Sequence, residues 1–164
     1  IFVYFLLAAQ YESYILPWAV LLSIPVGLIG VFLVINLVGL QNNIYVQVGL
    51  IMLIGLLAKN AILIVEFAVQ ERKNGKTIVE AAINGAKLRL RPILMTSLAF
   101  VAGLVPLMWT VGPSAIGNHS ISFSAAGGML LGVAFGIFII PVLFVIFKGL
   151  DEKLQDKLAK EEEE

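Results

Sequence analysis

The sequence predicts an all-α protein, a polytopic bundle of about five transmembrane helices of which the first is truncated. No Asp, Glu, Lys or Arg occurs between Ser13 and Ala58, or between Pro92 and Phe147. Each tract is far longer than the roughly 20 residues that a helix needs to cross a bilayer. Only 13% of the 164 residues are charged, against about 25% in an ordinary soluble domain. Mean hydropathy is +0.98, so we expect lipid to be the main solvent.

Composition also argues against several classes of function. The net charge is zero, which gives no reason to expect a nucleic-acid partner, and the lack of cysteine removes disulfides and thiol nucleophiles. No paired carboxylates, Ser/His/Asp set, Walker-type glycine loop or metal-ligand spacing is found, so we predict neither an enzyme nor a bound cofactor. The chain starts inside an apolar run at Ile1, without a recognisable signal peptide, and we interpret it as a piece of a longer protein.

Each helix is placed by its apolar run and by the polar residues that end it. We expect spans at residues 1–9 (truncated), 15–38, 44–68, about 92–110 and about 121–147. Thr77 and Glu80 have the spacing of a capping box, which predicts a separate amphipathic helix over about 77–90 at the cytoplasmic surface, ending near Pro92. His119 falls in the predicted turn 111–120, where we expect it to be solvated. Residues 148–164 are predicted to form a charged, roughly helical cytoplasmic tail.

The distribution of basic residues predicts the orientation. Segment 69–91 contains six Lys or Arg and the tail contains four, whereas the turns 39–43 and 111–120 contain none. By the positive-inside rule, the two basic segments are cytoplasmic and the two turns without basic residues face outward. The C-terminus is therefore predicted on the cytoplasmic side.

Lys59 is the one basic residue inside a predicted span, at the sixteenth position of 44–68. A lysine near the bilayer centre costs about 2.5–3.5 kcal/mol on insertion scales, so it needs a partner or water. Snorkelling to the cytoplasmic side is one interpretation, and an intramembrane ion or proton site is the other. Glu66 lies seven residues later, about 10 Å along the helix axis, which is too far for direct pairing. We therefore predict that the counter-charge of Lys59 lies on a helix outside this chain.

Other polar residues accompany Lys59. Asn60 is its neighbour, and Arg89 and Thr96 flank Pro92 at the cytoplasmic mouth of the fourth span. Arg89 binds either lipid phosphate or an inward charge relay, while a hydroxyl such as that of Thr96 most often bonds the preceding turn of its own helix. A stripe of small residues recurs every fourth position in the fifth span, which predicts close helix packing and no chemistry: Ser124, Gly128, Gly132 and Gly136.

Two longer motifs resemble the resistance-nodulation-division (RND) efflux transporters. Residues 55–68, GLLAKNAILIVEFA, are similar to the tenth transmembrane helix of that family, and 89–100, RLRPILMTSLAF, to the start of the eleventh. Residues 11–13 and 45–50 also match the pattern of that family. The sequence of 58–68 is more similar to the hydrophobe/amphiphile (AcrB/MexB-like) branch than to the metal-exporting branch. The resemblance covers the chain to about Phe147.

The resemblance implies that 1–147 correspond to helices eight (partial) to twelve of a twelve-helix subunit in the bacterial inner membrane. It implies a homotrimer that exchanges protons for drugs and works with a periplasmic adaptor and an outer-membrane channel, with the proton gradient in place of a cofactor. Lys59, Arg89 and Thr96 match the proton relay and Asn60 a neighbour of it. The family's two relay aspartates are absent from this chain and are expected in the remaining part of the subunit. Alternatives are an RND exporter of metal or lipid, or a structural fragment without activity alone.

Overall fold

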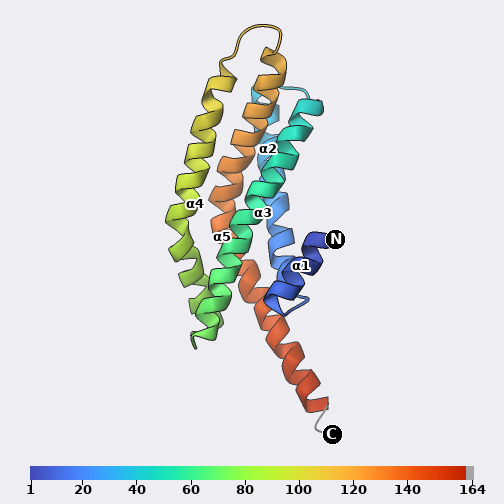
Figure 1. Cartoon of the computed structure of the whole chain (residues 1–164), viewed down its shortest axis with the longest axis vertical. Helices are drawn as coiled ribbons and strands as arrows, with labels where there is room; N and C mark the ends of the chain where they lie inside the picture. Colours follow the sequence, from blue (N-terminus) through green and yellow to red (C-terminus); the bar gives the residue numbers. More distant parts are fainter. Residues whose placement is uncertain (162–164) are drawn as a thin grey trace.

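The computed structural model describes residues 1–161, which form five helices and no strand within that range (Figure 1). The prediction of an all-α bundle is confirmed. Four of the helices are long and apolar enough to cross a membrane, and the first is a short apolar helix. Their bounds are α1 Phe2–Tyr11, α2 Leu16–Val38, α3 Ile44–Lys73, α4 Ile78–Met108 and α5 Ala115–Glu161.

Helix α5 holds the bundle together, because it packs against α2, α3 and α4. Its small residues allow this: a Cβ on Gly132 would lie 2.9 Å from the side chain of Leu57 on α3 and 3.2 Å from Gly27 on α2. Large apolar side chains fill the remaining space, including the fully buried Leu53 of α3 and Phe144 of α5. Many other large apolar side chains face outward, as expected of helices surrounded by lipid or by further helices.

The connections lie at two ends of the bundle. The turns 39–43 and 109–114 lie at one end, and the turn 74–77 lies at the other, beside the C-terminal part of α5 (Figure 1). We call the second end the basic end, because the Lys and Arg residues of 72–91 and 148–160 are clustered towards it. Gly39 ends α2 with a φ of +74°, which glycine adopts without strain.

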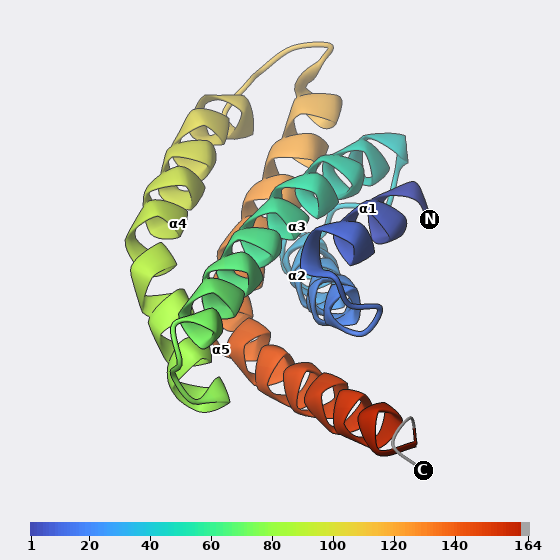
Figure 2. The same ribbon diagram turned by 60° about the horizontal axis from the view of Figure 1, so that its bottom comes forward.

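The prediction of a separate surface helix at 77–90 is wrong. The capping box is present, since Thr77 Oγ1 accepts from the Glu80 N–H at 3.3 Å and Glu80 Oε2 from the Thr77 N–H at 3.4 Å. The helix that it starts, however, continues through Pro92 as α4, and its ribbon curves without breaking (Figure 2). A proline inside a helix removes one backbone bond. Packing compensates on both sides of it, since Gly85 lies against Ala68 of α3 and Ile93 is buried.

The polar loop predicted from residue 69 is also shorter than expected. Residues 69–73 extend α3, which ends at Lys73; Asn74 caps it, and Gly75 follows with a φ of +89°. No glycine or proline interrupts 69–73, so the helix continues beyond its apolar part.

The predicted turn 111–120 ends earlier than expected, because α5 begins at Ala115. The first turns of α5 are held by contacts with α3: Asn43 Nδ2 donates to Ser120 Oγ at 3.0 Å, and Gly117 lies against the ring of Tyr45. His119 is therefore half-buried in a helix, with Nε2 2.9 Å from the Thr110 carbonyl oxygen, and the expectation that it is solvated is wrong. The tail continues α5 beyond the bundle to Glu161, and the last three glutamates of the predicted tail lie outside the described residues (Figures 1 and 2).

Candidate intramembrane relay site

Four residues singled out from the sequence line one cavity between α3 and α4. The cavity has a volume of about 240 Å³, and Lys59, Asn60, Arg89 and Thr96 all contribute to its wall. The other lining residues are apolar: Leu56, Leu63, Pro92, Ile93, Phe100 and Met129. We call this space the relay cavity.

Helical spacing explains why these residues meet. On α3 the lining residues recur as Leu56, Lys59, Asn60 and Leu63, which are positions i, i+3, i+4 and i+7 of one helix face. On α4 the same spacing runs from Arg89 through Pro92 and Ile93 to Thr96. Two antiparallel helices that turn these faces towards each other bring the ammonium, the guanidinium and the hydroxyl to one space. The sequence therefore places both halves of the site, while their pairing depends on the packing of α3 against α4.

Lys59 forms no ion pair with any of residues 1–161. The ion pairs within this range join Arg72 to Glu152, Lys76 to Glu71, and Lys148 to Asp151. Glu66, seven residues from Lys59 on the same helix, is not among its partners. The side chain of Lys59 is exposed at the wall of the relay cavity, so a carboxylate from outside the described residues has access to it.

Arg89 is held by an aromatic ring. Its guanidinium carbon lies 3.9 Å from the centroid of the Phe67 ring on α3, within the range of a cation–π interaction. Its Nε is buried and has no hydrogen-bond partner in the described part of the chain. Phe67 was missed in the sequence, although it lies seven residues after Asn60 and therefore close to the same face of α3.

Thr96 and Asn60 complete the polar wall. The Thr96 hydroxyl lies 3.1 Å from the Pro92 carbonyl oxygen and 3.0 Å from that of Ile93, so its hydrogen is used within its own helix. The oxygen keeps lone pairs that can accept from a group in the cavity. The Nδ2 of Asn60 is buried without a partner among residues 1–161.

The predicted small-residue stripe of α5 lies on the face that meets α2 and α3, except at its last member. A Cβ on Gly128 would collide with the side chains of Leu53 and Val31. Ser124 lies so close to Gly49 of α3 that a Cβ on this glycine would collide with Ser124 Oγ. Gly132 approaches Leu57 and Gly27 as described above. Gly136 differs, because a Cβ there would meet only Ile140 of α5 itself, at 3.6 Å.

A second polar cluster lies at the basic end and was not foreseen. Asp151 of α5 is only 6% exposed; its Oδ1 accepts from Ser13 Oγ at 2.9 Å, and its Oδ2 lies 3.3 Å from Lys148 Nζ. Ser13 Oγ also accepts from the backbone N–H of Leu16 at 3.4 Å, at the start of α2. The burial of Asp151 was not predicted because this residue lies in a run of charged residues, and such a run by itself indicates a solvated surface.

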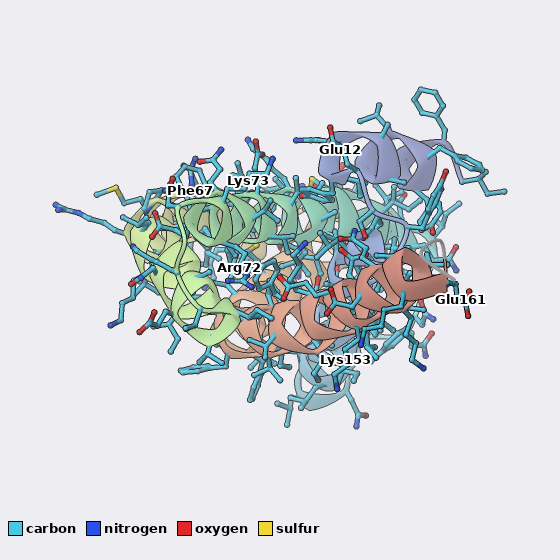
Figure 3. The ribbon with its side chains drawn as sticks, turned by 90° about the horizontal axis from the view of Figure 1, so that it is seen from below. Glu12, Phe67, Arg72, Lys73, Lys153 and Glu161 are labelled. Carbon is cyan, nitrogen blue, oxygen red and sulfur yellow. The ribbon has the colours of Figure 1, made fainter. Side chains whose placement is uncertain are left out.

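The same cluster extends to α3 through a forked ion pair. Arg72 Nε donates to Glu152 Oε1 at 2.9 Å, and Nη2 donates to Oε2 at 3.1 Å. Figure 3 shows Arg72 on the side of α3 that faces α5, while the labelled Lys73 lies on the outer side. The hydrogen bonds and charge of Glu152 raise the pKa of Arg72, so its guanidinium remains charged. Ser13, Arg72, Lys148, Asp151 and Glu152 are called the basic-end cluster below.

Unlike the paired charges of the basic-end cluster, the charged groups of the relay cavity lack carboxylate partners among the described residues. The relay cavity presents one ammonium and one guanidinium with an unpartnered N–H, and no described carboxylate pairs with Lys59. Opposite charge near a lysine in a low-dielectric space favours its ionised form, so this cavity is suited to one or more carboxylates supplied by another segment.

Comparison with known proteins identifies the family. The model of the AcrB/AcrD/AcrF family matches residues 1–148. The multidrug resistance protein MdtF of Escherichia coli is 48% identical over 149 residues, which are 90% of this chain and 14% of MdtF. The toluene efflux pump membrane transporters TtgB and TtgE of Pseudomonas putida are 47% and 43% identical over 92% and 99% of this chain. These ranges are 14% of TtgB and 16% of TtgE. The chain, which spans about one seventh of these relatives, belongs to the AcrB/AcrD/AcrF family of RND multidrug efflux transporters.

Proposed function

We propose that this chain is the C-terminal membrane part of a proton-driven efflux transporter, and that it supplies the basic half of an intramembrane proton relay. The single observation that carries the proposal is the convergence of Lys59, Asn60, Arg89 and Thr96 on one cavity, with no described carboxylate beside Lys59. A charged lysine in a span is stable only if a counter-charge or water reaches it. The acidic half is assigned to the remaining part of the subunit.

The proposed cycle uses the charge of Lys59. With the carboxylates deprotonated, the Lys59 ammonium pairs with them across the relay cavity. Protonation of the carboxylates removes that attraction, and Lys59 turns towards neutral acceptors such as the Asn60 amide oxygen or Thr96 hydroxyl. The change of partner favours a second arrangement of α3 and α4, and this movement of the helices is transmitted to the drug pathway. A proton that crosses the whole membrane potential contributes about 2.3 kcal/mol per 100 mV, enough to shift a two-state equilibrium.

We propose the assembly and location on the basis of the family. We assign the full-length protein to the bacterial inner membrane as a homotrimer, with the basic end in the cytoplasm, together with a periplasmic adaptor, an outer-membrane channel and surrounding lipid. The names of the relatives refer to multidrug resistance, toluene and antibiotic efflux, which supports export of apolar or amphiphilic organic compounds. Export of metal or lipid is the alternative, and metal-tolerance assays beside drug-susceptibility assays separate the two.

The test is export by the full-length protein in a bacterial strain that lacks its own pumps. Lys59→Ala is expected to abolish drug resistance at an unchanged membrane level of the protein, because the carboxylates lose their counter-charge. Lys73→Ala is the matched control: it removes a lysine from the same helix, on the outer side of the basic end (Figure 3). Resistance retained by Lys59→Ala at a normal protein level contradicts the relay.

A further inference from the structure

A second, smaller cavity lies where four helices meet, beside the relay cavity. Its volume is about 20 Å³, which is room for one water molecule. Each of the four long helices contributes to its wall. The lining residues are Ser23 of α2, Leu57, Asn60 and Ile64 of α3, Ile93 of α4, and Gly132, Val133, Gly136, Ile137 and Ile140 of α5.

Only two of these residues have polar side chains. Ser23 is 7% exposed, and its hydroxyl donates to the Val20 carbonyl oxygen at 2.6 Å. Its oxygen therefore retains lone pairs to accept a further bond. Asn60 contributes the second side chain, and its buried Nδ2 has no partner among residues 1–161. Leaving a buried donor unpaired costs more than an ordinary hydrogen bond gains, so an N–H in this position calls for an acceptor.

Asn60 also connects the two cavities, since it lines both of them. Its Nδ2 is already covered by the described residues, so a bulky group from another segment reaches it only by displacing some of them. Water fits without such displacement. A water that accepts from Asn60 Nδ2 and donates to Ser23 Oγ satisfies both groups, and it fixes the orientation of the Asn60 amide, a side chain that also lines the relay cavity with Lys59 and Thr96.

Gly136 of α5 lies at the wall of this small cavity. A Cβ on Gly132 would lie 2.9 Å from both terminal carbons of Leu57, so that glycine serves close packing. A Cβ on Gly136 would meet no neighbouring helix within 4 Å, and its nearest contact would be Ile140 Cδ1 at 3.6 Å. A methyl group at position 136 therefore fits without a clash at the wall of this small cavity.

We propose that one water binds between Ser23 and Asn60, and that Ser23 is a positioning residue of the relay. It acts through that water by orienting the Asn60 amide. The role in proton coupling rests on the proposed function, whereas the binding site itself does not. Ser23 thereby connects α2 to a relay whose other members lie on α3 and α4.

The binding site is tested by a structure of the full-length protein at a resolution that resolves bound water. We expect a water within about 2.7–3.2 Å of both Asn60 Nδ2 and Ser23 Oγ, and its loss in Gly136→Ala. A side chain in that space, or a direct bond from Asn60 Nδ2 to a protein group, overturns the site. This readout does not depend on transport, so it stands even if Lys59→Ala retains export.

The positioning role is tested by the pH profile of proton-coupled efflux in the full-length protein. Ser23→Ala and Gly136→Ala are each expected to lower the transport rate roughly five- to tenfold, the effect of losing one buried hydrogen bond, and to shift its pH dependence. The controls are Ser122→Ala, a buried serine with the same helix-internal bond, and Gly103→Ala, a helical glycine with open space around it. Profiles of Ser23→Ala and Gly136→Ala that match the controls overturn the role.

Discussion

The relay cavity and the basic-end cluster both gather charged side chains from α3 and a neighbouring helix, yet they use them in opposite ways. At the basic end, Lys148 and Arg72 each have a carboxylate from α5 within 3.3 Å, and Asp151 also accepts from Ser13. In the relay cavity, Lys59 has no described carboxylate partner, and Arg89 Nε and Asn60 Nδ2 are buried without partners. The charges of the first region are paired within residues 1–161, whereas those of the second are not, and under the proposed function the second is half of a site.

This difference separates structural from functional charge. A buried, fully paired charge is strongly coupled to the fold, because removal of one partner leaves the other unpaired. A charge in a span without a partner does not stabilise this chain, and its cost is offset only when another segment or water reaches it. Substitutions at the basic end are therefore expected to change stability first, and those in the relay cavity to change transport first.

The largest effect on stability is expected from Asp151→Ala. The substitution leaves Lys148 without its partner and Ser13 without its acceptor, at a cost of about 2–4 kcal/mol of unfolding free energy. Chemical unfolding of the purified full-length protein in detergent measures this cost, with Asp156→Ala on the exposed part of α5 as the matched control. Equal stability of the two variants contradicts a structural role for the cluster.

An intermediate effect, on transport alone, is expected from Thr96→Val. The substitution keeps the branched shape but removes the hydroxyl that faces the relay cavity, and we expect the efflux rate to fall about tenfold, the equivalent of one hydrogen bond. Thr96→Ser keeps the hydroxyl and is expected to transport normally. Unchanged efflux by the valine variant, or an equal loss by the serine variant, shows that the hydroxyl has no role.

The smallest effect is expected from Arg72→Lys. The lysine keeps the positive charge but loses the two parallel bonds to Glu152, and both side chains are about one third exposed, at 33% and 32%, so water screens the pair. An arginine is protonated throughout the neutral range, and Glu152 raises the pKa of Arg72 further, so the contribution of Arg72 is present at neutral pH and is lost on the alkaline side as the pH rises through that raised pKa. Near neutral pH, Arg72→Lys is expected to lower the free energy of unfolding by less than Asp151→Ala does. The difference between Arg72→Lys and the unsubstituted protein is expected to shrink further at high salt. A loss as large as that of Asp151→Ala contradicts this ranking.

The sequence predicts those features that depend on spacing along one helix. The charge-free tracts give the four long helices, and the positions of Lys59, Asn60, Arg89 and Thr96 define two helix faces before any packing is known. The continuity of α4 through Pro92 was not predicted, because local propensity ends a helix there, whereas the close approach of Gly85 to Ala68 and the burial of Ile93 are seen only in the packed structure.

Contacts between residues far apart in the chain were not predictable either. Ser13 and Asp151 are separated by 138 positions, and nothing in the spacing of either residue indicates the other. The same holds for Asn43 and Ser120, whose hydrogen bond joins the first turns of α5 to the start of α3, in a segment where glycine and asparagine suggest a turn. Such pairs depend on the angles and depths at which helices cross, which a single sequence does not specify.

The most direct test of the account is the position of Lys59 in a structure of the full-length subunit determined near neutral pH. We expect a carboxylate from outside these 164 residues to project into the relay cavity, with an oxygen within about 4 Å of Lys59 Nζ and a longer separation when the same protein is studied in acid. A Lys59 side chain that extends to the lipid or to the cytoplasmic surface, with no carboxylate in the cavity at either pH, would contradict the relay.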